Sequence, residues 1–290
     1  MQLTLEHITK SYTKGKKRKN ALEDFTLTLT EGVYGLLGPN GAGKSTLINI
    51  ITGIIGKDSG SIAFSDGGDN SFLSHLGFMP QGMDFYRNFT AKDYIKYIMA
   101  LKKYSPDNAD EYALSVLDRV NLHSDADKKI GAFSGGMKQR LGIAQAIVGE
   151  PKVLIFDEPT AGLDVEARNE ILDLLRDYAA EDENRTILIT SHIASDLEHL
   201  CDDIYLIHGG KQLLHEETDV ILEQYGLIKA DEAQYAALDK EYLLGSRKEP
   251  YGYACLTNDR KYYEENVPGL VVERAGIDEV ILMMTGGKRK

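Results

Sequence analysis

The sequence predicts an α/β fold with a largely parallel sheet, and three observations support this class. An apolar strand at 33–37 runs into a glycine-rich loop and then into a helix that starts near Lys44. Beyond it, apolar strands alternate with helical segments, which is typical of parallel sheets with crossover helices. Between the two parts lie helical segments at 91–103 and 109–120, with apolar residues on one face, which predict an inserted helical subdomain.

Two segments near the N-terminus, 3–8 and 22–29, predict strands of an antiparallel β subdomain. In the second, Phe25, Leu27 and Leu29 alternate with threonines, which is the period of a half-buried strand. The Gly209-Gly210 pair between two short apolar runs predicts a hairpin. Further strands are expected at 76–79, 153–156, 186–190, 204–207 and 212–214, and further helices at 135–148, 165–178 and 195–200.

The length of 290 residues suggests about two domains. We place the boundary near Gly226, because the chain beyond it becomes polar and rich in tyrosine. Apolar segments return at 269–272 and 279–283, and we expect both to be strands. The tail is therefore predicted to be a small C-terminal α+β appendage.

Composition excludes several classes of protein. Hydrophobic residues make up 42% and charged residues 27%, and the net charge is −12, so nucleic acid is not the expected partner. Cys201 and Cys255 belong to no metal-binding spacing and are expected to be reduced thiols in a cytosolic protein. The N-terminus lacks the pattern of a secretory signal, and no apolar stretch is long enough to span a bilayer.

A basic segment, 14–20, lies between the first two predicted strands. It can be a solvated hairpin tip. It can also be an anion-facing patch close to a nucleotide or to anionic lipid. The sequence leaves both interpretations open.

The glycine-rich segment fits the phosphate-loop pattern G-x-x-x-x-G-K-[ST]. Glycines let backbone N–H groups turn towards an anion, and the following helix directs its positive end at the phosphates. Lys44 adds a charge for the β- and γ-phosphates, and the Ser45 hydroxyl can bind Mg²⁺. The segment consists of Gly38, Pro39, Asn40, Gly41, Ala42, Gly43, Lys44, Ser45 and Thr46.

Two acids, Asp157 and Glu158, end the apolar run 153–156. A buried parallel strand ends at the carboxyl edge of its sheet, which is where the phosphate loop also leaves its strand. Asp157 can therefore reach Mg²⁺, and Glu158 can act as the general base towards water. Taken alone, the pair could instead be two solvated acids before the next helix.

A second phosphate-type motif, Ser134-Gly135-Gly136, precedes a predicted helix, where it could also serve only as an N-cap. With Phe133 before it and Met137 after it, this segment resembles the signature L-S-G-G-Q of the ABC ATPases, and the core Ser-Gly-Gly matches. The two departures, at 133 and 137, keep the backbone donors and the Ser134 hydroxyl. Only the role of the side chain at 137 is left open.

Further matches follow in the order of that family. Gln81 resembles the Q-loop glutamine, near Mg²⁺ and the attacking water, and the segment 161–164 resembles the D-loop that crosses the dimer interface. His192 resembles the switch histidine that contacts the γ-phosphate, and Tyr12 stands where the family places an aromatic residue that stacks on adenine. The segment 275–286 resembles the ending common in ATPases of ABC-2-type exporters.

The resemblance implies an ATP-hydrolysing subunit that binds ATP and Mg²⁺. It implies a P-loop NTPase core of ABC type over residues 1–226, with a helical subdomain at about 82–148, followed by an accessory domain at 227–290. It also implies a closed dimer, homomeric or heteromeric, in which ATP lies between the phosphate loop of one subunit and Ser134, Gly135 and Gly136 of the other.

The resemblance further implies separate membrane-spanning permease subunits, export rather than import, and a cytoplasmic protein bound peripherally to the inner face of the membrane. The helical segment 85–120 would contact the permease, and Phe85, Tyr86 and Phe89 are expected to be exposed there. These aromatic residues could equally belong to the core of the subdomain.

Two other functions remain as alternatives. A soluble non-transport ABC ATPase would act on nucleic acid or the ribosome, but the single ATPase domain and the acidic charge argue against it. A regulatory module would bind ATP without turnover. Lys44, Asp157, Glu158 and His192 together argue against that.

Overall fold

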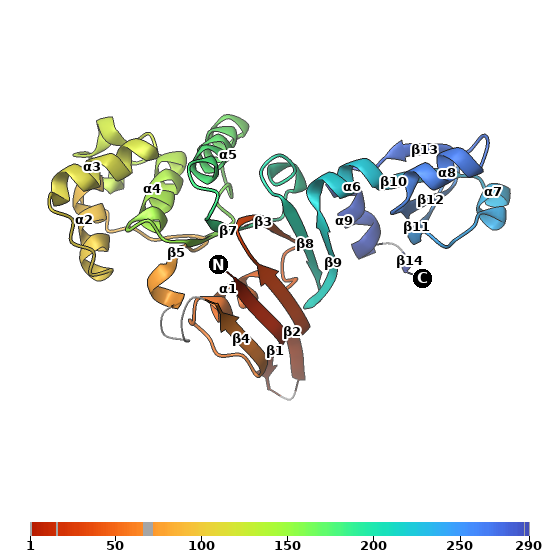
Figure 1. Ribbon diagram of the computed structural model, residues 1–290, viewed down its shortest axis with the longest axis horizontal. Helices are drawn as coiled ribbons and strands as arrows, with labels where there is room; N and C mark the ends of the chain where they lie inside the picture. Colours follow the sequence, from red (N-terminus) through yellow and green to blue (C-terminus); the bar gives the residue numbers. More distant parts are fainter. Residues whose placement is uncertain (1, 16, 66–71, 287, 290) are drawn as a thin grey trace.

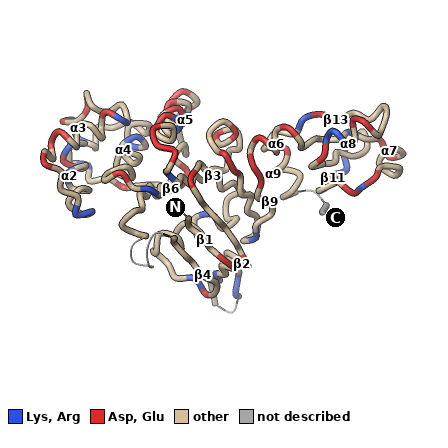
Figure 2. The backbone as a smooth tube through the Cα atoms, in the orientation of Figure 1, with Lys and Arg blue, Asp and Glu red and all other residues tan. Residues whose placement is uncertain are grey.

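The computed structural model describes residues 2–15, 17–65, 72–286 and 288–289. A central sheet connects three peripheral parts (Figure 1): a helical part, a small antiparallel sheet and a C-terminal part. Acidic residues are spread over the chain, as Figure 2 shows. Within the described segments, no helix is both long and apolar enough to cross a membrane.

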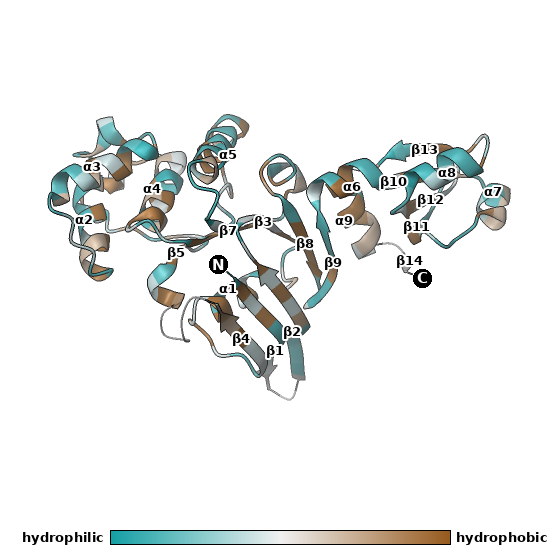
Figure 3. Cartoon of the chain, in the orientation of Figure 1, coloured by the Kyte–Doolittle hydropathy of each residue, from teal (hydrophilic) through white to brown (hydrophobic). Residues whose placement is uncertain are grey.

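The central sheet has six strands in the order β5-β6-β7-β3-β8-β9. All neighbours are parallel except β8 and β9, which form the hairpin predicted at Gly209-Gly210. Two inner strands are buried along their whole length, because both faces of the sheet are covered. Apolar residues, in brown, are prominent in this sheet (Figure 3). The strands are β3 (Gly32–Leu37), β5 (Leu76–Met79), β6 (Val153–Asp157), β7 (Thr186–Ser191), β8 (Asp203–His208) and β9 (Lys211–Glu217).

The antiparallel sheet has the order β2-β1-β4, and helix α1 (Lys44–Ile51) packs in the core between it and the central sheet. Its first two strands are longer than predicted because they continue past their apolar residues into a polar hairpin. The third was not predicted, because serine and glycine dominate its sequence. These strands are β1 (Leu3–Lys14), β2 (Lys17–Leu29) and β4 (Ser59–Phe64).

Four helices lie over the other face of the central sheet and beside it, and all four fall in segments that were predicted to be helical. Each begins at a side-chain N-cap that accepts a backbone N–H bond. These caps explain why the starts of the helices could be predicted closely from the sequence. The helices are α2 (Ala91–Leu101), α3 (Ala109–Arg119), α4 (Gly135–Ile147) and α5 (Val165–Ala180).

The C-terminal part has five strands in the order β13-β10-β12-β11-β14, and three short helices accompany them. One face of this sheet packs on tyrosines and leucines that form a separate small core. The elements are α6 (Thr218–Gln224), β10 (Gly226–Ala230), α7 (Glu232–Ala237), β11 (Leu243–Glu249), β12 (Gly252–Thr257), α8 (Arg260–Asn266), β13 (Val271–Arg274) and β14 (Lys288–Arg289).

Two predicted elements are wrong. The segment 279–283 lies in helix α9 (Ile277–Gly286), not in a strand. Its buried residues Ile277, Val280 and Met283 follow a helical spacing, although Val and Ile individually favour strands. The helix expected at 195–200 is a 3₁₀ turn, Ala194–Asp196, followed by further turns.

Helix α9 does not stay within the C-terminal part. It packs against the 3₁₀ turn Ala194–Asp196, and Val280 and Met283 belong to the same apolar core as Ala194. The tail is therefore in direct contact with the segment that follows His192.

Candidate nucleotide-binding site

The phosphate loop connects β3 to α1 and lies against the second strand of the antiparallel sheet. Gly43 has φ +122°, a conformation that residues with a side chain rarely adopt. A Cβ atom at Gly43 would also lie 2.6 Å from the carbonyl oxygen of Ala21. Glycine is therefore required here, both for the backbone turn and for the close approach of the neighbouring strand.

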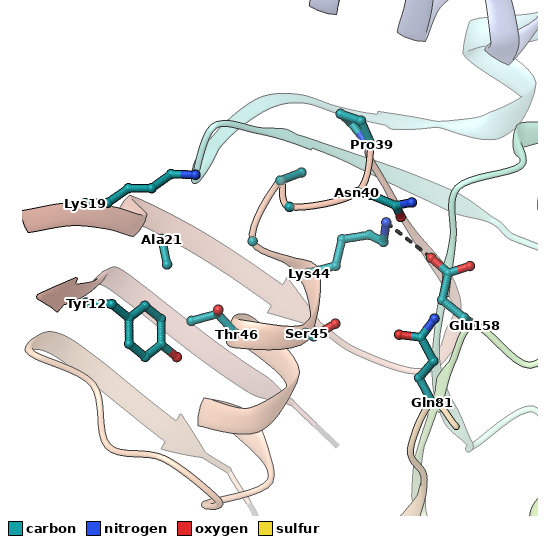
Figure 4. Close-up of a pocket in the computed structure, with 13 residues that line it drawn as sticks. Tyr12, Lys19, Ala21, Pro39, Asn40, Lys44, Ser45, Thr46, Gln81 and Glu158 are labelled. Carbon is teal, nitrogen blue, oxygen red and sulfur yellow. Dashed lines mark ion pairs between the residues drawn. The ribbon is translucent and has the colours of Figure 1, made fainter. Parts of the chain in front are cut away.

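The loop opens onto a cavity of about 320 Å³ (Figure 4). This cavity brings together most of the sequence-predicted residues: Tyr12, the loop, Gln81 and Glu158. It also brings in Lys19 and Ala21, to which the sequence assigned no individual role. The lining residues are Tyr12, Lys19, Ala21, Pro39, Asn40, Gly41, Ala42, Gly43, Lys44, Ser45, Thr46, Gln81 and Glu158.

The Lys44 side chain points into this cavity and meets Glu158 there (Figure 4). Its Nζ donates to the carbonyl oxygen of Gly38 at 2.6 Å and lies 3.2 Å from Glu158 Oε1. Both side chains are buried, at 6% and 5% exposure. An unpaired buried charge is costly, so Glu158 stabilises the Lys44 ammonium in the cavity, and an anionic phosphate offers it a partner of the same charge.

The Thr190 hydroxyl, which the sequence analysis missed, holds both acids. Thr190 lies opposite Asp157 in the parallel register of β6 and β7. Its Oγ1 donates to Asp157 Oδ1 at 2.6 Å and accepts from the backbone N–H of Glu158 at 2.9 Å. Burial raises the pKa of Asp157, and the hydrogen bond from Thr190 opposes that rise.

Glu158 itself has a backbone in the left-handed region, with φ +53°. Its second carboxylate oxygen, Oε2, lies 2.6 Å from Nδ1 of His192, whose side chain is 44% exposed. The carboxylate thus connects Lys44 on one side with His192 on the other. A non-glycine residue with this strained backbone at the edge of a cavity is typical of functional sites.

The residues proposed for a metal ion offer oxygen donors. Ser45 lies within hydrogen-bonding reach of Asp157, and Gln81 lines the cavity on the same side as Glu158, away from Tyr12 (Figure 4). In the part of the chain that the structure describes, no three acidic, histidine or cysteine side chains form a metal-binding group. A hydroxyl, a carboxylate and an amide fit Mg²⁺, which usually takes one or two protein ligands and completes its shell with water and phosphate oxygens.

Tyr12 and Lys19 lie on the antiparallel sheet at the side of the cavity (Figure 4). Tyr12 is 48% exposed, which leaves part of its side chain accessible for stacking on a base, and Lys10 Nζ lies 6.0 Å from the ring centroid. Within the basic segment 14–20, the position of Lys19 fits the anion-facing interpretation. Lys16 lies outside the described residues.

Ser134, Gly135 and Gly136 do not line this cavity. They begin α4, where Ser134 Oγ accepts from the backbone N–H of Met137 at 3.2 Å. A Cβ atom at Gly136 would lie 3.5 Å from the Cβ of Ala167 in α5, so the end of α4 packs close to that helix. The Met137 side chain is half-buried against the main core.

The predicted exposure of the three aromatic residues after Gln81 is only partly correct. Tyr86 is 57% exposed, whereas Phe85 and Phe89 are half-buried against the core. Phe85 packs edge-on against Tyr94 at a centroid distance of 5.3 Å, and Phe89 contacts Tyr86 at the same distance. Aromatic contacts within the subdomain therefore cover two of the three rings.

Comparison with known proteins identifies the family to which the chain is similar. The sequence profile described as "ABC transporter" matches residues 22–161. The lantibiotic transport ATP-binding protein SrtF of Streptococcus pyogenes is 38% identical over 220 residues, covering 75% of this chain and 91% of its own. The linearmycin resistance ATP-binding protein LnrL of Bacillus subtilis (strain 168) is 36% identical, covering 75% and 70%. The Nod factor export ATP-binding protein I of Burkholderia orbicola (strain AU 1054) is also 36% identical, covering 66% and 63%.

Solved structures agree with the sequence comparison. The dimeric ATP-binding cassette MJ0796, in a post-hydrolysis state bound to ADP and Pi, superposes with a TM-score of 0.66 at 25% identity, covering 74% of this chain and 98% of its own. The ATP-binding subunit of another ABC transporter superposes with a TM-score of 0.65 at 28% identity, covering 76% and 92%.

Proposed function

Because this chain belongs to the ATP-binding proteins of ABC transporters, we propose that it binds ATP in the cavity around Lys44 and hydrolyses it to drive export through separate membrane subunits. One observation carries the assignment of the site. The phosphate loop with the cation of Lys44, Glu158 and Tyr12 all line a single cavity, and Glu158 is in turn in contact with His192 just outside it. A triphosphate needs donors and positive charge at one end and a water-directing carboxylate at the other.

The roles of the residues follow from their positions. Tyr12 stacks on the adenine, the backbone N–H groups of Asn40, Gly41, Ala42 and Gly43 hold the phosphates, and the Thr46 side chain faces the same cavity. Lys44 then transfers from Glu158 to the γ-phosphate. This exchange leaves the Glu158 carboxylate, still in contact with His192, to orient a water for in-line attack.

Mg²⁺ would be held by Ser45, Asp157 and Gln81, and it would offset the charge of the β- and γ-phosphates. Oxygen donors alone, on three different elements, support this choice over a softer metal. Lys19 adds positive charge beside the phosphate loop, although it is more exposed than Lys44.

A second subunit supplies the facing half of the site. Ser134, Gly135 and Gly136 begin a helix and so offer N–H donors, yet they lie outside the cavity of their own chain. Two chains that pair with these helix ends over each other's phosphate loops would enclose two ATP molecules. ATP would then stabilise the closed dimer, and loss of the γ-phosphate would favour opening.

The membrane partner would be a permease subunit on the cytoplasmic side of the membrane. The proposed contact surface follows Gln81 directly. It consists of Tyr86, the half-buried Phe85 and Phe89, and the helices after them. Residues 1–226 would form the nucleotide-binding domain, with the helical subdomain at 82–148, and 227–290 an accessory domain. The relatives are named for lantibiotic transport, linearmycin resistance and Nod factor export. The cargo of this chain would be set by its permease.

The transporter relatives favour this function over action on nucleic acid or the ribosome. The net charge of −12 also opposes binding to a polyanion, so we expect no nucleic-acid partner. A module that only senses ATP would not need Glu158 held between Lys44 and His192.

Glu158→Gln tests the proposal. The amide keeps the shape but cannot accept a proton, so ATP turnover should fall by at least about 100-fold while ATP binding persists and an ATP-bound dimer accumulates. Steady-state hydrolysis and size-exclusion chromatography with ATP measure the two effects. Glu183→Gln, an exposed residue outside the cavity, is the matched control and should change neither. Unchanged turnover in the Glu158 variant would remove Glu158 from the role of base.

A further inference from the structure

Three polar residues outside the nucleotide cavity join the loop after Glu158 to the turn after His192. Asp196 ends the 3₁₀ turn Ala194–Asp196 and is buried, at 2% exposure. Its Oδ2 accepts from the Thr160 hydroxyl at 2.7 Å. Its Oδ1 accepts from the guanidinium of Arg168, which also donates to Ser195 Oγ at 3.2 Å.

These residues lie close in the chain to the two residues proposed to act on the γ-phosphate and water. Thr160 is two residues after Glu158, and Asp196 is four residues after His192. Arg168 lies in the first turns of α5, whose N-cap Asp164 ends the segment that resembles the D-loop. Asp196 is therefore bonded to both flanks of the segment 161–164, and it holds them against the turn that follows His192.

Burial makes the cluster sensitive to the loss of any member. Both carboxylate oxygens of Asp196 have a donor, and the Thr160 side chain is itself buried, at 4% exposure. Removing one donor would leave a buried carboxylate oxygen unsatisfied. A buried ion pair contributes little net stability compared with apolar packing, so its main effect is to select one relative position of the two loops.

The other side of the same turn is also fixed. Ala194 lies in the core that Val280 and Met283 of α9 help to form. The turn thus packs on apolar residues on one side and is tied through Asp196 to the Glu158 loop on the other.

We propose that Asp196 is a positioning residue for ATP hydrolysis: through Thr160 and Arg168 it fixes the Glu158 loop relative to the His192 turn, and so sets the contact between those two side chains. The proposal rests on the function proposed above. It requires that breaking the cluster slow the chemical step without weakening ATP binding, because no member of the cluster lines the nucleotide cavity.

The test compares Thr160→Val with Thr160→Ser in the full chain. Valine keeps the shape and removes the donor to Asp196, whereas serine keeps the donor. We expect kcat to fall about tenfold for valine, the cost of roughly one hydrogen bond to a charged group, with KM and the Kd for ATP changed less than about twofold. Serine should restore kcat to within about twofold of the unmodified chain.

Asp196→Asn perturbs the same cluster from its acceptor side. Together with Thr160→Val and the double variant, it makes a double-mutant cycle. If the two residues act as one unit, the double variant should lose no more than about the larger single effect. Asp173→Asn is the control: it removes an exposed ion pair with Arg176 on the same helix, α5, and should leave kcat unchanged.

Three results would overturn the proposal: equal kcat for valine and serine, additive losses in the cycle, or a loss of kcat that parallels a loss of ATP affinity. Failure of the proposed function looks different, because then the unmodified chain would neither bind nor hydrolyse ATP. If the unmodified chain turns over and Thr160→Val does so equally well, only the positioning role is lost.

Discussion

Replacing Thr190 by valine tests how the two acids at the end of β6 are held. Valine has nearly the same shape but lacks the hydroxyl, and Thr190 is completely buried. The change removes the hydrogen bond that Asp157 accepts at 2.6 Å. It also removes the acceptor of the Glu158 N–H at 2.9 Å, because the valine methyl group takes the place of the hydroxyl.

The expected cost follows from these two bonds. A hydrogen bond to a charged group contributes roughly 1.5–3 kcal/mol, and an unsatisfied buried N–H costs about 1–3 kcal/mol. The free energy of unfolding should therefore fall by about 3 kcal/mol, which lowers Tm by about 6 °C in a chain of this size. ATP hydrolysis should decrease more than ATP binding, because Lys44 and the phosphate loop do not contact Thr190.

Thermal unfolding followed by circular dichroism, together with steady-state hydrolysis, measures both effects. Thr190→Ser is the matched control, since it keeps both hydrogen bonds and loses only a methyl group, at a cost of about 1 kcal/mol. If valine and serine lowered Tm and kcat to the same extent, the hydroxyl would not be what holds the acids, and the loss would be one of packing.

Two further predictions concern the rest of the chain. Met283→Ala opens a cavity in the buried face of α9, which should lower the free energy of unfolding by about 2–5 kcal/mol and should also reduce kcat through the turn Ala194–Asp196. Leu282→Ala is the control, because its side chain is 50% exposed, and it should have neither effect. Unchanged kcat in the Met283 variant would show that α9 does not influence the site. Alkaline unfolding should be steep, because burial raises the pKa of four buried tyrosines to about 12. Between about pH 10 and about pH 12 the folded state keeps protons that the unfolded state loses. The free energy of unfolding therefore falls by about 5 kcal/mol per pH unit in this range. Tyrosinate absorbance that rose well before loss of the circular dichroism signal would contradict this. The four are Tyr94, Tyr205, Tyr225 and Tyr263.

The sequence is sufficient to predict those features whose structure depends on a single segment of the chain. The phosphate loop, the acids after 153–156 and the starts of helices α2 to α5 all depend on neighbouring residues, and each lies where the pattern placed it. The order of β6 and β7 in a parallel sheet could have suggested Thr190 as well, because it is the polar residue opposite Asp157.

Other features depend on segments far apart in the chain, and these were missed. The contact of Asp196 with Thr160 and Arg168 requires three loops to meet, which no local pattern encodes. The residue types in the apolar run of α9 predict a strand, whereas the segment is a helix. The spacing of its buried positions is set by the core that it covers, including the turn after His192.

The difference between Asp157 and Glu158 follows from the backbone between them. Asp157 is the last residue of β6 and keeps the direction of a strand side chain, so it meets the hydroxyl groups of Thr190 and Ser45. Glu158 leaves the strand in the left-handed region, which costs about 1 kcal/mol for a residue with a side chain. This turn directs its carboxylate to Lys44 and His192 instead.

The contacts of Glu158 offset that strain. The hydrogen bonds of Glu158 to Thr190 and His192 together contribute more than about 1 kcal/mol, which is the approximate cost of the left-handed backbone. One acid therefore faces oxygen donors suited to a hard cation, and its neighbour faces a cation and an imidazole suited to phosphate and water. Two adjacent carboxylates can serve different chemistry only because the strand ends between them, and a glycine at 158 would keep the turn but lose the base.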